Sequence, residues 1–140
     1  MRNRRGVREF LPATAPHILA IEDDTGLAEA VELLLSEAGF RFSHAATARE
    51  AVRAVHGVDF SLVLLDLTLP DASAEETVRA LRATGCSAPI VVLSGAVDAS
   101  IQAHALGADG FLPKPFDIDA LLAYVRRLSR EGDADSLALT

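Results

Sequence analysis

The sequence has little cysteine and no long hydrophobic run. Cys86 is the single cysteine in 140 residues, which excludes an intramolecular disulfide and favours a reducing, cytoplasmic environment. No apolar stretch approaches the ~18–20 residues of a membrane span, so no membrane contact is expected. The Arg-rich beginning of the chain has no continuous apolar segment and does not look like a secretory signal.

Positive charge is also scarce. The formal net charge is −7, which argues against nucleic acid or an anionic membrane as a partner of the core domain. The same charge fits a protein that gathers carboxylates around a cation. With 140 residues, half of them hydrophobic, the chain predicts one domain with a buried core.

Apolar runs alternate with helical patterns from His17 onward, which predicts an α/β fold. The runs ILAI, LVLL and IVVL are nearly uninterrupted, as in strands covered on both faces, whereas the second strand is more polar and suits an edge. The expected strands are Ile18–Ile21, Arg41–Ala45, Ser61–Leu65, Pro89–Leu93 and Gly110–Leu112.

Five helices are expected between and after these strands. An apolar stripe marks the first, from Leu27 to Ala38, and capping boxes at Thr47–Glu50 and Ser73–Glu76 begin the second and third. The fourth spans Asp98–Leu106, and the fifth carries apolar residues from Ile118 to Leu128. Right-handed crossovers then give a doubly wound, five-stranded parallel sheet with helices on both faces. We expect this domain to span 17–130, between a flexible basic extension (1–16) and a flexible tail (131–140).

Several polar residues fall where ligands bind in such a fold, at the carboxyl ends of the strands. These residues are Glu22, Asp23 and Asp24 after the first strand, Asp66 after the third, Ser94 after the fourth and Lys114 after the fifth. For Asp24 we prefer a helix-capping role. Clustered carboxylates repel and raise one another's pKa unless a cation neutralises them, and an all-oxygen set suits Mg²⁺. An aspartate can attack phosphorus, and a lysine and a hydroxyl can neutralise the transferred group.

Four motifs in this order make residues 17–129 resemble the receiver domain of bacterial two-component response regulators, which have the CheY-like fold. They are Ile21–Asp24, Leu64–Pro70, Val92–Gly95 and Gly107–Phe116.

The resemblance implies strand order 2-1-3-4-5 and a role for each matching residue. Asp66 would be the phosphoacceptor, and Lys114 the cation that binds the phosphate. The Mg²⁺ ligands would be Asp23, Asp66, Glu22 and the Thr68 backbone carbonyl, with Asp23 favoured over Glu22 as a direct ligand. Ser94 would be the switch hydroxyl and Phe111 the switch aromatic, and the peptide bond before Pro115 would be cis.

The function so implied is that of a single-domain response regulator, not an enzyme. A sensor histidine kinase or a histidine phosphotransfer protein would donate the phosphoryl group. The output would be a protein contact through the fourth helix, fifth strand and fifth helix; a homodimer stays open. Neither Thr68 nor Ala96 is suited to holding an attacking water, so we expect slow loss of the phosphate. After Pro70, the segment Asp71–Ala74 lacks the glycine usual in the family, and we expect an altered turn that lets Ser73 cap the next helix.

Three alternatives remain beside this interpretation. A haloacid dehalogenase-class phosphatase would need a second aspartate where Thr68 stands. A flavodoxin-like cofactor binder would need a phosphate-binding loop after the first strand, where the sequence has acids. A pseudo-receiver would bind partners without phosphorylation.

Overall fold

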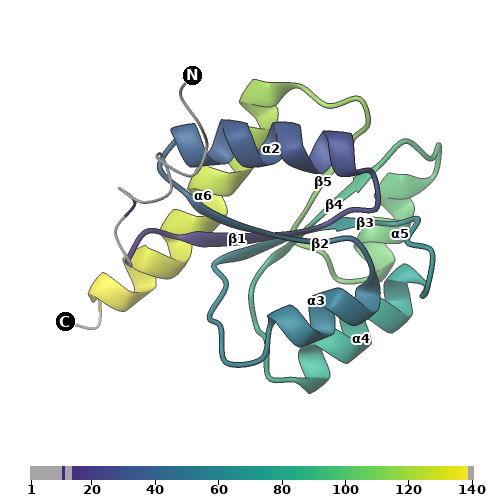
Figure 1. Cartoon of the computed structure of the whole chain (residues 1–140), viewed down its shortest axis with the longest axis horizontal. Helices are drawn as coiled ribbons and strands as arrows, with labels where there is room; N and C mark the ends of the chain where they lie inside the picture. The colour runs from purple at the N-terminus through teal and green to yellow at the C-terminus, as the bar shows by residue number, and fades with distance from the viewer. Residues whose placement is uncertain (1–10, 12–13, 139–140) are drawn as a thin grey trace.

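A computed structural model of the chain describes residue 11 and residues 14–138, with the backbone alone for residues 130–138. Five parallel strands form one sheet in the order β2-β1-β3-β4-β5 (Figure 1). The strands are β1 (His17–Ile21), β2 (Arg41–Ala45), β3 (Leu62–Asp66), β4 (Ile90–Ser94) and β5 (Gly110–Pro113). The predicted α/β fold and strand order are confirmed, and the more polar β2 lies at an edge.

Helices cover both faces of the sheet. They are α2 (Thr25–Glu37), α3 (Ala48–Ala54), α4 (Ala74–Ala83), α5 (Ala99–Ala105) and α6 (Ile118–Ala138). Helices α2 and α6 lie on one face, and α3, α4 and α5 lie on the other (Figure 1).

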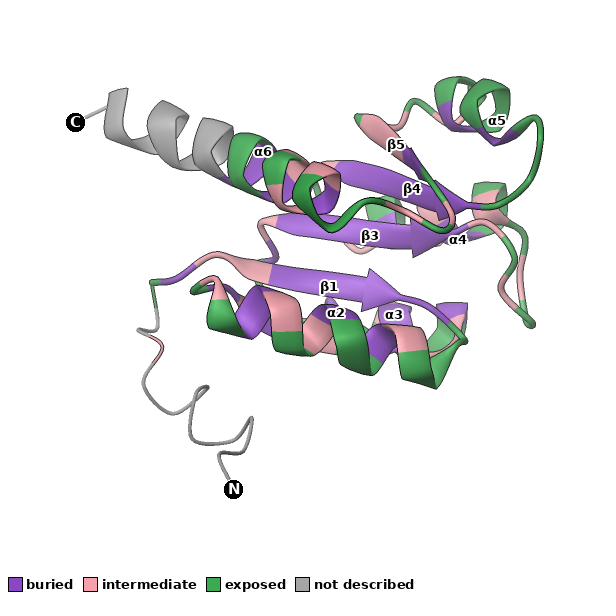
Figure 2. Cartoon of the chain, turned by 90° about the horizontal axis from the view of Figure 1, so that it is seen from above, coloured by how far each residue is buried: buried purple, intermediate pink, exposed green. Residues whose placement is uncertain are grey.

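The alternation of side chains along each central strand builds two cores. In β3, Leu62 and Leu64 pack toward α2 and α6, whereas Val63 and Leu65 pack toward α3 and α4. All four side chains are fully buried, and Figure 2 shows β1, β3 and β4 almost wholly as buried residues. Burial on both faces is why these strands read as uninterrupted apolar runs.

The starts of α3 and α4 follow the sequence signals with one correction. The capping box of Ser73 and Glu76 is complete at the start of α4. At α3, Thr47 accepts a hydrogen bond from the Glu50 N–H, but the Glu50 carboxylate accepts from Ala46 N at 2.8 Å and not from Thr47. The capping box predicted there is therefore only half formed, because the carboxylate reaches one residue further back.

Helix α6 continues to Ala138. The backbone of residues 131–138, which the sequence analysis assigned to a flexible tail, therefore belongs to a helix. Most of the predicted N-terminal extension (1–10, 12–13) and residues 139–140 lie outside the described residues. Within the described part of the chain, no helix has the length and apolar character needed to cross a membrane.

Candidate functional site

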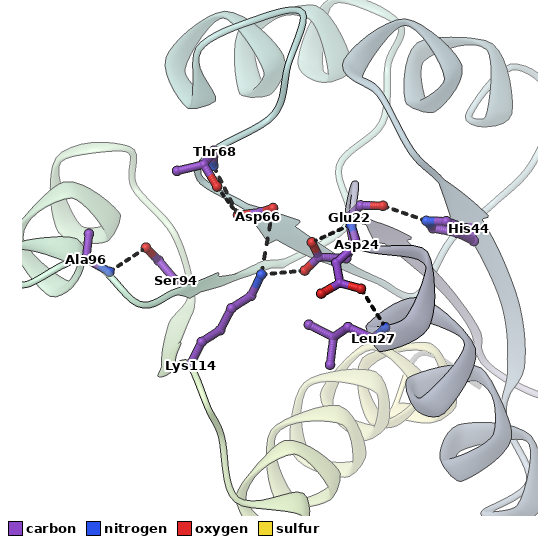
Figure 3. Close-up of polar contacts among 9 residues, drawn as sticks. All are labelled: Glu22, Asp24, Leu27, His44, Asp66, Thr68, Ser94, Ala96 and Lys114. Carbon is purple, nitrogen blue, oxygen red and sulfur yellow. Dashed lines mark hydrogen bonds and ion pairs between the residues drawn. The ribbon is translucent and has the colours of Figure 1, made fainter.

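The candidate site lies at the carboxyl ends of β1, β3 and β5, where parallel strands present their last residues along one edge (Figure 3). Asp66 is the final residue of β3, and Glu22 and Lys114 directly follow β1 and β5. Glu22 is fixed through its backbone: its N–H donates to Ala45 O at 2.9 Å, and its carbonyl accepts from His44 Nε2 at 2.6 Å. Sequence reasoning gave His44 no role at the site, because nothing marked it beyond its place near the end of β2.

Three carboxylates gather at this edge. Glu22, Asp23 and Asp66 each offer an oxygen, and the three oxygens lie within 4.8 Å of one another. Glu22 and Asp66 are buried, with 3% and 2% of their surface exposed, whereas Asp23 faces solvent. The cluster therefore has a buried floor and one open side.

Lys114 supplies positive charge to this cluster. Its Nζ lies 2.6 Å from Glu22 Oε1 and 3.7 Å from Asp66 Oδ2. The peptide bond between Lys114 and Pro115 is cis, the geometry that the resemblance implies.

Thr68 holds one oxygen of Asp66. The Thr68 N–H and the Thr68 hydroxyl both donate to Asp66 Oδ1, each at 3.0 Å (Figure 3). Sequence reasoning gave the Thr68 carbonyl a place among the metal ligands but did not anticipate that the Thr68 side chain bonds to Asp66. A threonine two residues after an aspartate was the available signal, because aspartate side chains often accept from the backbone two residues on.

The environment shifts the pKa values of the two buried carboxylates in opposite directions, upward for Glu22 and downward for Asp66. Burial raises the pKa of Glu22, and the neighbouring Asp66 adds to this, although hydrogen bonds from Lys114 and from Asp24 N–H oppose it. Burial would also raise the pKa of Asp66, but the Thr68 N–H, the contact with Glu22 and the charge of Lys114 outweigh it and lower that pKa. Asp66 is therefore held as the carboxylate, the form that a nucleophile needs.

The other predicted residues lie around this centre. Ser94, buried at the end of β4, accepts a hydrogen bond from Ala96 N at 3.1 Å, and its carbonyl accepts from Lys114 N at 2.8 Å. Phe111 is half-buried and packs with the core on the α3–α5 side. Asp24 caps α2 by accepting from Leu27 N at 3.0 Å, as preferred from the sequence. The described residues form no hydrogen bond or ion pair between Ser94 or Phe111 and Asp66.

Comparison with known protein families shows which family this chain belongs to. The response regulator receiver domain family matches residues 18–126. The chain belongs to this family. The cell cycle transcriptional regulator CtrA of Caulobacter vibrioides is 36% identical to this receiver over 127 residues, which cover 88% of the present chain but 55% of CtrA. The chain thus spans little more than half the length of this relative.

Solved receiver structures agree with the fold. The chemotaxis response regulator CheY4 of Vibrio cholerae matches with a TM-score of 0.74 and 29% identity, over 82% of this chain and 99% of CheY4. The non-phosphorylated HemR receiver domain of Leptospira biflexa matches with a TM-score of 0.72 and 31% identity, over 81% and 94% of the two chains.

The donor set of this receiver fits Mg²⁺. Carboxylate oxygens are the hard ligands that Mg²⁺ prefers, and an open side leaves room for the waters that it retains. Glu22 already uses Oε1 for Lys114 and Oε2 for Asp24 N–H. Asp23 is exposed at the open side of the cluster, which favours Asp23 over Glu22 as a direct ligand.

Proposed function

We propose that this receiver accepts a phosphoryl group on Asp66 from a phosphohistidine. The donor would be a sensor histidine kinase or a histidine phosphotransfer protein in the cytoplasm. The observation that carries the proposal is the environment of Asp66: one carboxylate oxygen is bonded twice to Thr68, while the other faces Lys114. The receiver would act as a phosphoacceptor and a switch, and not as an enzyme that turns over a substrate.

In the transfer, a carboxylate oxygen of Asp66 forms the new bond to phosphorus. The P–N bond of the phosphohistidine breaks, and its electron pair leaves with the imidazole of the donor. Thr68 fixes Oδ1, so Oδ2 on the Lys114 side is the freer nucleophile. The Lys114 ammonium, 3.7 Å from Oδ2, compensates charge on the added group. Mg²⁺ bound by Asp23, Asp66 and the Thr68 carbonyl would supply further neutralisation of the phosphoryl oxygens.

The donor would dock beside the site. A groove of about 430 Å³ separates α2 from the segment that begins α6, and Asp24 and Lys114 line it together with apolar side chains. Its lining includes Leu27, Leu34, Phe116 and Ile118, and Ile118 is 54% exposed. An apolar helix face of a phosphohistidine protein fits such a groove and would bring the imidazole to the edge that holds Asp66.

The output would pass through α5, β5 and α6. Ser94 and Phe111 would reorient toward the phosphorylated Asp66 and bias this surface between two states. Two apolar side chains are largely or fully exposed here: Ile101 on α5, and Val97 in the loop that leads from Ser94 into α5. These side chains would contact a protein target or a second copy of the receiver.

Intact-mass measurement after incubation with acetyl phosphate and Mg²⁺ tests the proposal. We expect the mass of one phosphoryl group to be added in the presence of Mg²⁺ and lost when EDTA is included. Asp66→Asn should abolish the adduct. Asp24→Asn is the matched control, because this carboxylate caps α2, and it should be phosphorylated like the wild type.

An adduct that survives Asp66→Asn would place the acceptor elsewhere and reject the proposal. Absence of an adduct on a folded wild-type chain would favour a pseudo-receiver, and steady release of inorganic phosphate from a phosphomonoester would favour the phosphatase alternative.

A further inference from the structure

Asp71 makes a contact that its position in the sequence does not suggest. It lies in the segment between β3 and α4, five residues after Asp66, yet its carboxylate reaches the first turn of α3. Asp71 Oδ1 accepts from Ala48 N at 2.9 Å, and Oδ2 accepts from Arg49 N at 3.0 Å. Both oxygens are thus used on a helix 22 and 23 residues away in sequence.

This contact completes the start of α3. The Thr47 hydroxyl accepts from the Glu50 N–H and leaves the Ala48 and Arg49 N–H groups to Asp71, and a seven-residue helix is too short to be stable by itself. The first free N–H groups of a helix require acceptors, and a carboxylate there also interacts favourably with the helix dipole. The hydrogen bonds from Ala48 and Arg49 lower the pKa of Asp71, so the group is ionised at neutral pH.

The other end of the contact is the loop that carries Thr68. Leu67 and Leu69 of this loop pack against the core on the α3–α5 side. Hydrogen bonds attach the loop at three further points: at Asp66 through Thr68, at α3 through Asp71, and at the start of α4 through the Ser73–Glu76 capping box. Of these, only the Asp71 contact fixes the middle of the loop to a different element. No glycine stands in residues 67–73, so side-chain contacts hold this turn.

We propose that Asp71 is a positioning residue for the phosphoacceptor site. By anchoring the loop to α3, it holds Thr68 over Asp66 and thereby sets the affinity of the site for Mg²⁺. The inference rests on the proposed function, since it concerns the metal that phosphorylation would require. The alternative is that Asp71 stabilises the start of α3 as a helix cap and has no effect on the site.

Glu50→Ala separates these two roles. Glu50 is an exposed carboxylate at the same helix start, and it accepts from Ala46 N without touching the loop. Asp71→Ala and Glu50→Ala both remove one negative charge and one capping carboxylate there. Only the first detaches the loop. Asp71→Asn keeps one acceptor oxygen and provides a milder variant that should fold even where the alanine variant does not.

Two readouts on the whole chain test the proposal: Mg²⁺ affinity by calorimetric titration, and hydrogen exchange of the Thr68 amide by NMR. We expect Asp71→Ala to weaken Mg²⁺ binding about tenfold, the lower end for residues that orient metal ligands. It should also speed exchange of the Thr68 amide, with Asp71→Asn intermediate. Glu50→Ala should lower thermal stability while leaving both readouts at wild-type values.

If both Asp71 variants bind Mg²⁺ and exchange the Thr68 amide as the wild type does, the inference is overturned and the proposed function still stands. Equal effects of Asp71→Ala and Glu50→Ala on both readouts would also overturn it. If the wild type binds no Mg²⁺, the proposed function fails. In that case, faster hydrogen exchange of the Thr68 amide in Asp71→Ala, with no such change in Glu50→Ala, would still support the positioning role of Asp71.

Discussion

Lys114 Nζ donates to Glu22 Oε1 at 2.6 Å, although 92 positions separate the two residues. Their strands are not neighbours, because β3 and β4 lie between β1 and β5. The long lysine side chain spans this gap along the edge of the sheet. Glu22 is almost completely buried, with 4% of its side chain exposed, and the Lys114 side chain is 24% exposed. Among the residues that the structure describes, Lys114 is the cation that pairs with these carboxylates.

Lys114→Met should therefore destabilise the protein at neutral pH. Removing one partner of a buried ion pair leaves the other charge uncompensated, and Lys114 is partly solvated, so we expect a loss of about 1–3 kcal/mol in the free energy of unfolding. Urea denaturation followed by circular dichroism measures this. Saturating Mg²⁺ should restore part of the loss, because a bound cation would again neutralise the carboxylates.

Arg79→Met is the control for this substitution. Arg79 forms an ion pair of 2.8 Å with Glu75 on the surface of α4, where both side chains are at least 70% exposed. Such pairs contribute about 0–1 kcal/mol. Equal destabilisation by the two substitutions would contradict a special electrostatic role for Lys114.

The fold was predictable because each local signal agreed with the global one. The run LVLL is buried on both faces, as read from the sequence, and glycines with positive φ follow the first four helices of the domain. The end of α6 was harder to place, because residues 131–138 are polar and acidic and carry no stripe that distinguishes a helix from a tail. The Thr47–Glu50 signal failed in detail, since a flexible carboxylate can choose between adjacent N–H groups.

The centre of the site was predictable for a related reason. Parallel strands bring their carboxyl ends together, so Asp66, Glu22 and Lys114 were expected to meet. The contacts of His44 and Asp71 were not, because each depends on how a loop or strand end approaches another element. Nothing in the local sequence around Asp71 points to the N–H groups of Ala48 and Arg49.

His17 should make stability depend on pH near neutrality. Burial, with the charge of Arg41 as a second cause, lowers the pKa of His17 below its ordinary value of 6.5. The unfolded chain therefore binds this proton more readily, so the contribution of neutral His17 is complete above pH 6.5 and is lost as the pH falls through and below that value. We expect the stability difference between the wild type and His17→Gln to move against the wild type on acidification. Urea denaturation of the wild type and of His17→Gln, at pH values above and below 6.5, measures this stability difference.

A difference that stays constant with pH, or that moves in favour of the wild type on acidification, would contradict this assignment. Gln at position 17 can keep a hydrogen bond to the Ser43 hydroxyl, which lies 2.8 Å from His17 Nε2. The comparison thus isolates the titration of the ring from the loss of that bond.

Gly110→Ala should disturb the packing of α6 on β5. A Cβ at Gly110 would collide with the ring of Tyr124, whose face also lies 5.5 Å from the Arg127 guanidinium. We expect the free energy of unfolding to fall by about 1–3 kcal/mol, as for other overpacked sites. Thermal denaturation checks this, and the cost of Gly110→Ala should shrink in a Tyr124→Ala background. Gly26→Ala is the control, because its Cβ would meet only Asp24 Oδ1 at an ordinary 3.5 Å; it should be neutral or stabilising by up to about 1 kcal/mol.

The lifetime of the phosphorylated form should be long and should depend on residue 96. Ala96 is exposed and its N–H donates to Ser94 Oγ, and its methyl side chain carries no polar group that could orient a water. Ala96→Asn introduces an amide that can hold a water for attack on the phosphorus, and we expect hydrolysis to speed up about tenfold, a modest value for positioning of this kind. Intact mass followed over time, after removal of acetyl phosphate with Mg²⁺ kept present, measures the decay.

Val97→Asn is the matched control, because Val97 is fully exposed one residue further on, and it should decay like the wild type. A wild-type half-life of seconds would contradict the predicted long lifetime. Equal acceleration by the two asparagine variants would show that residue 96 does not limit hydrolysis.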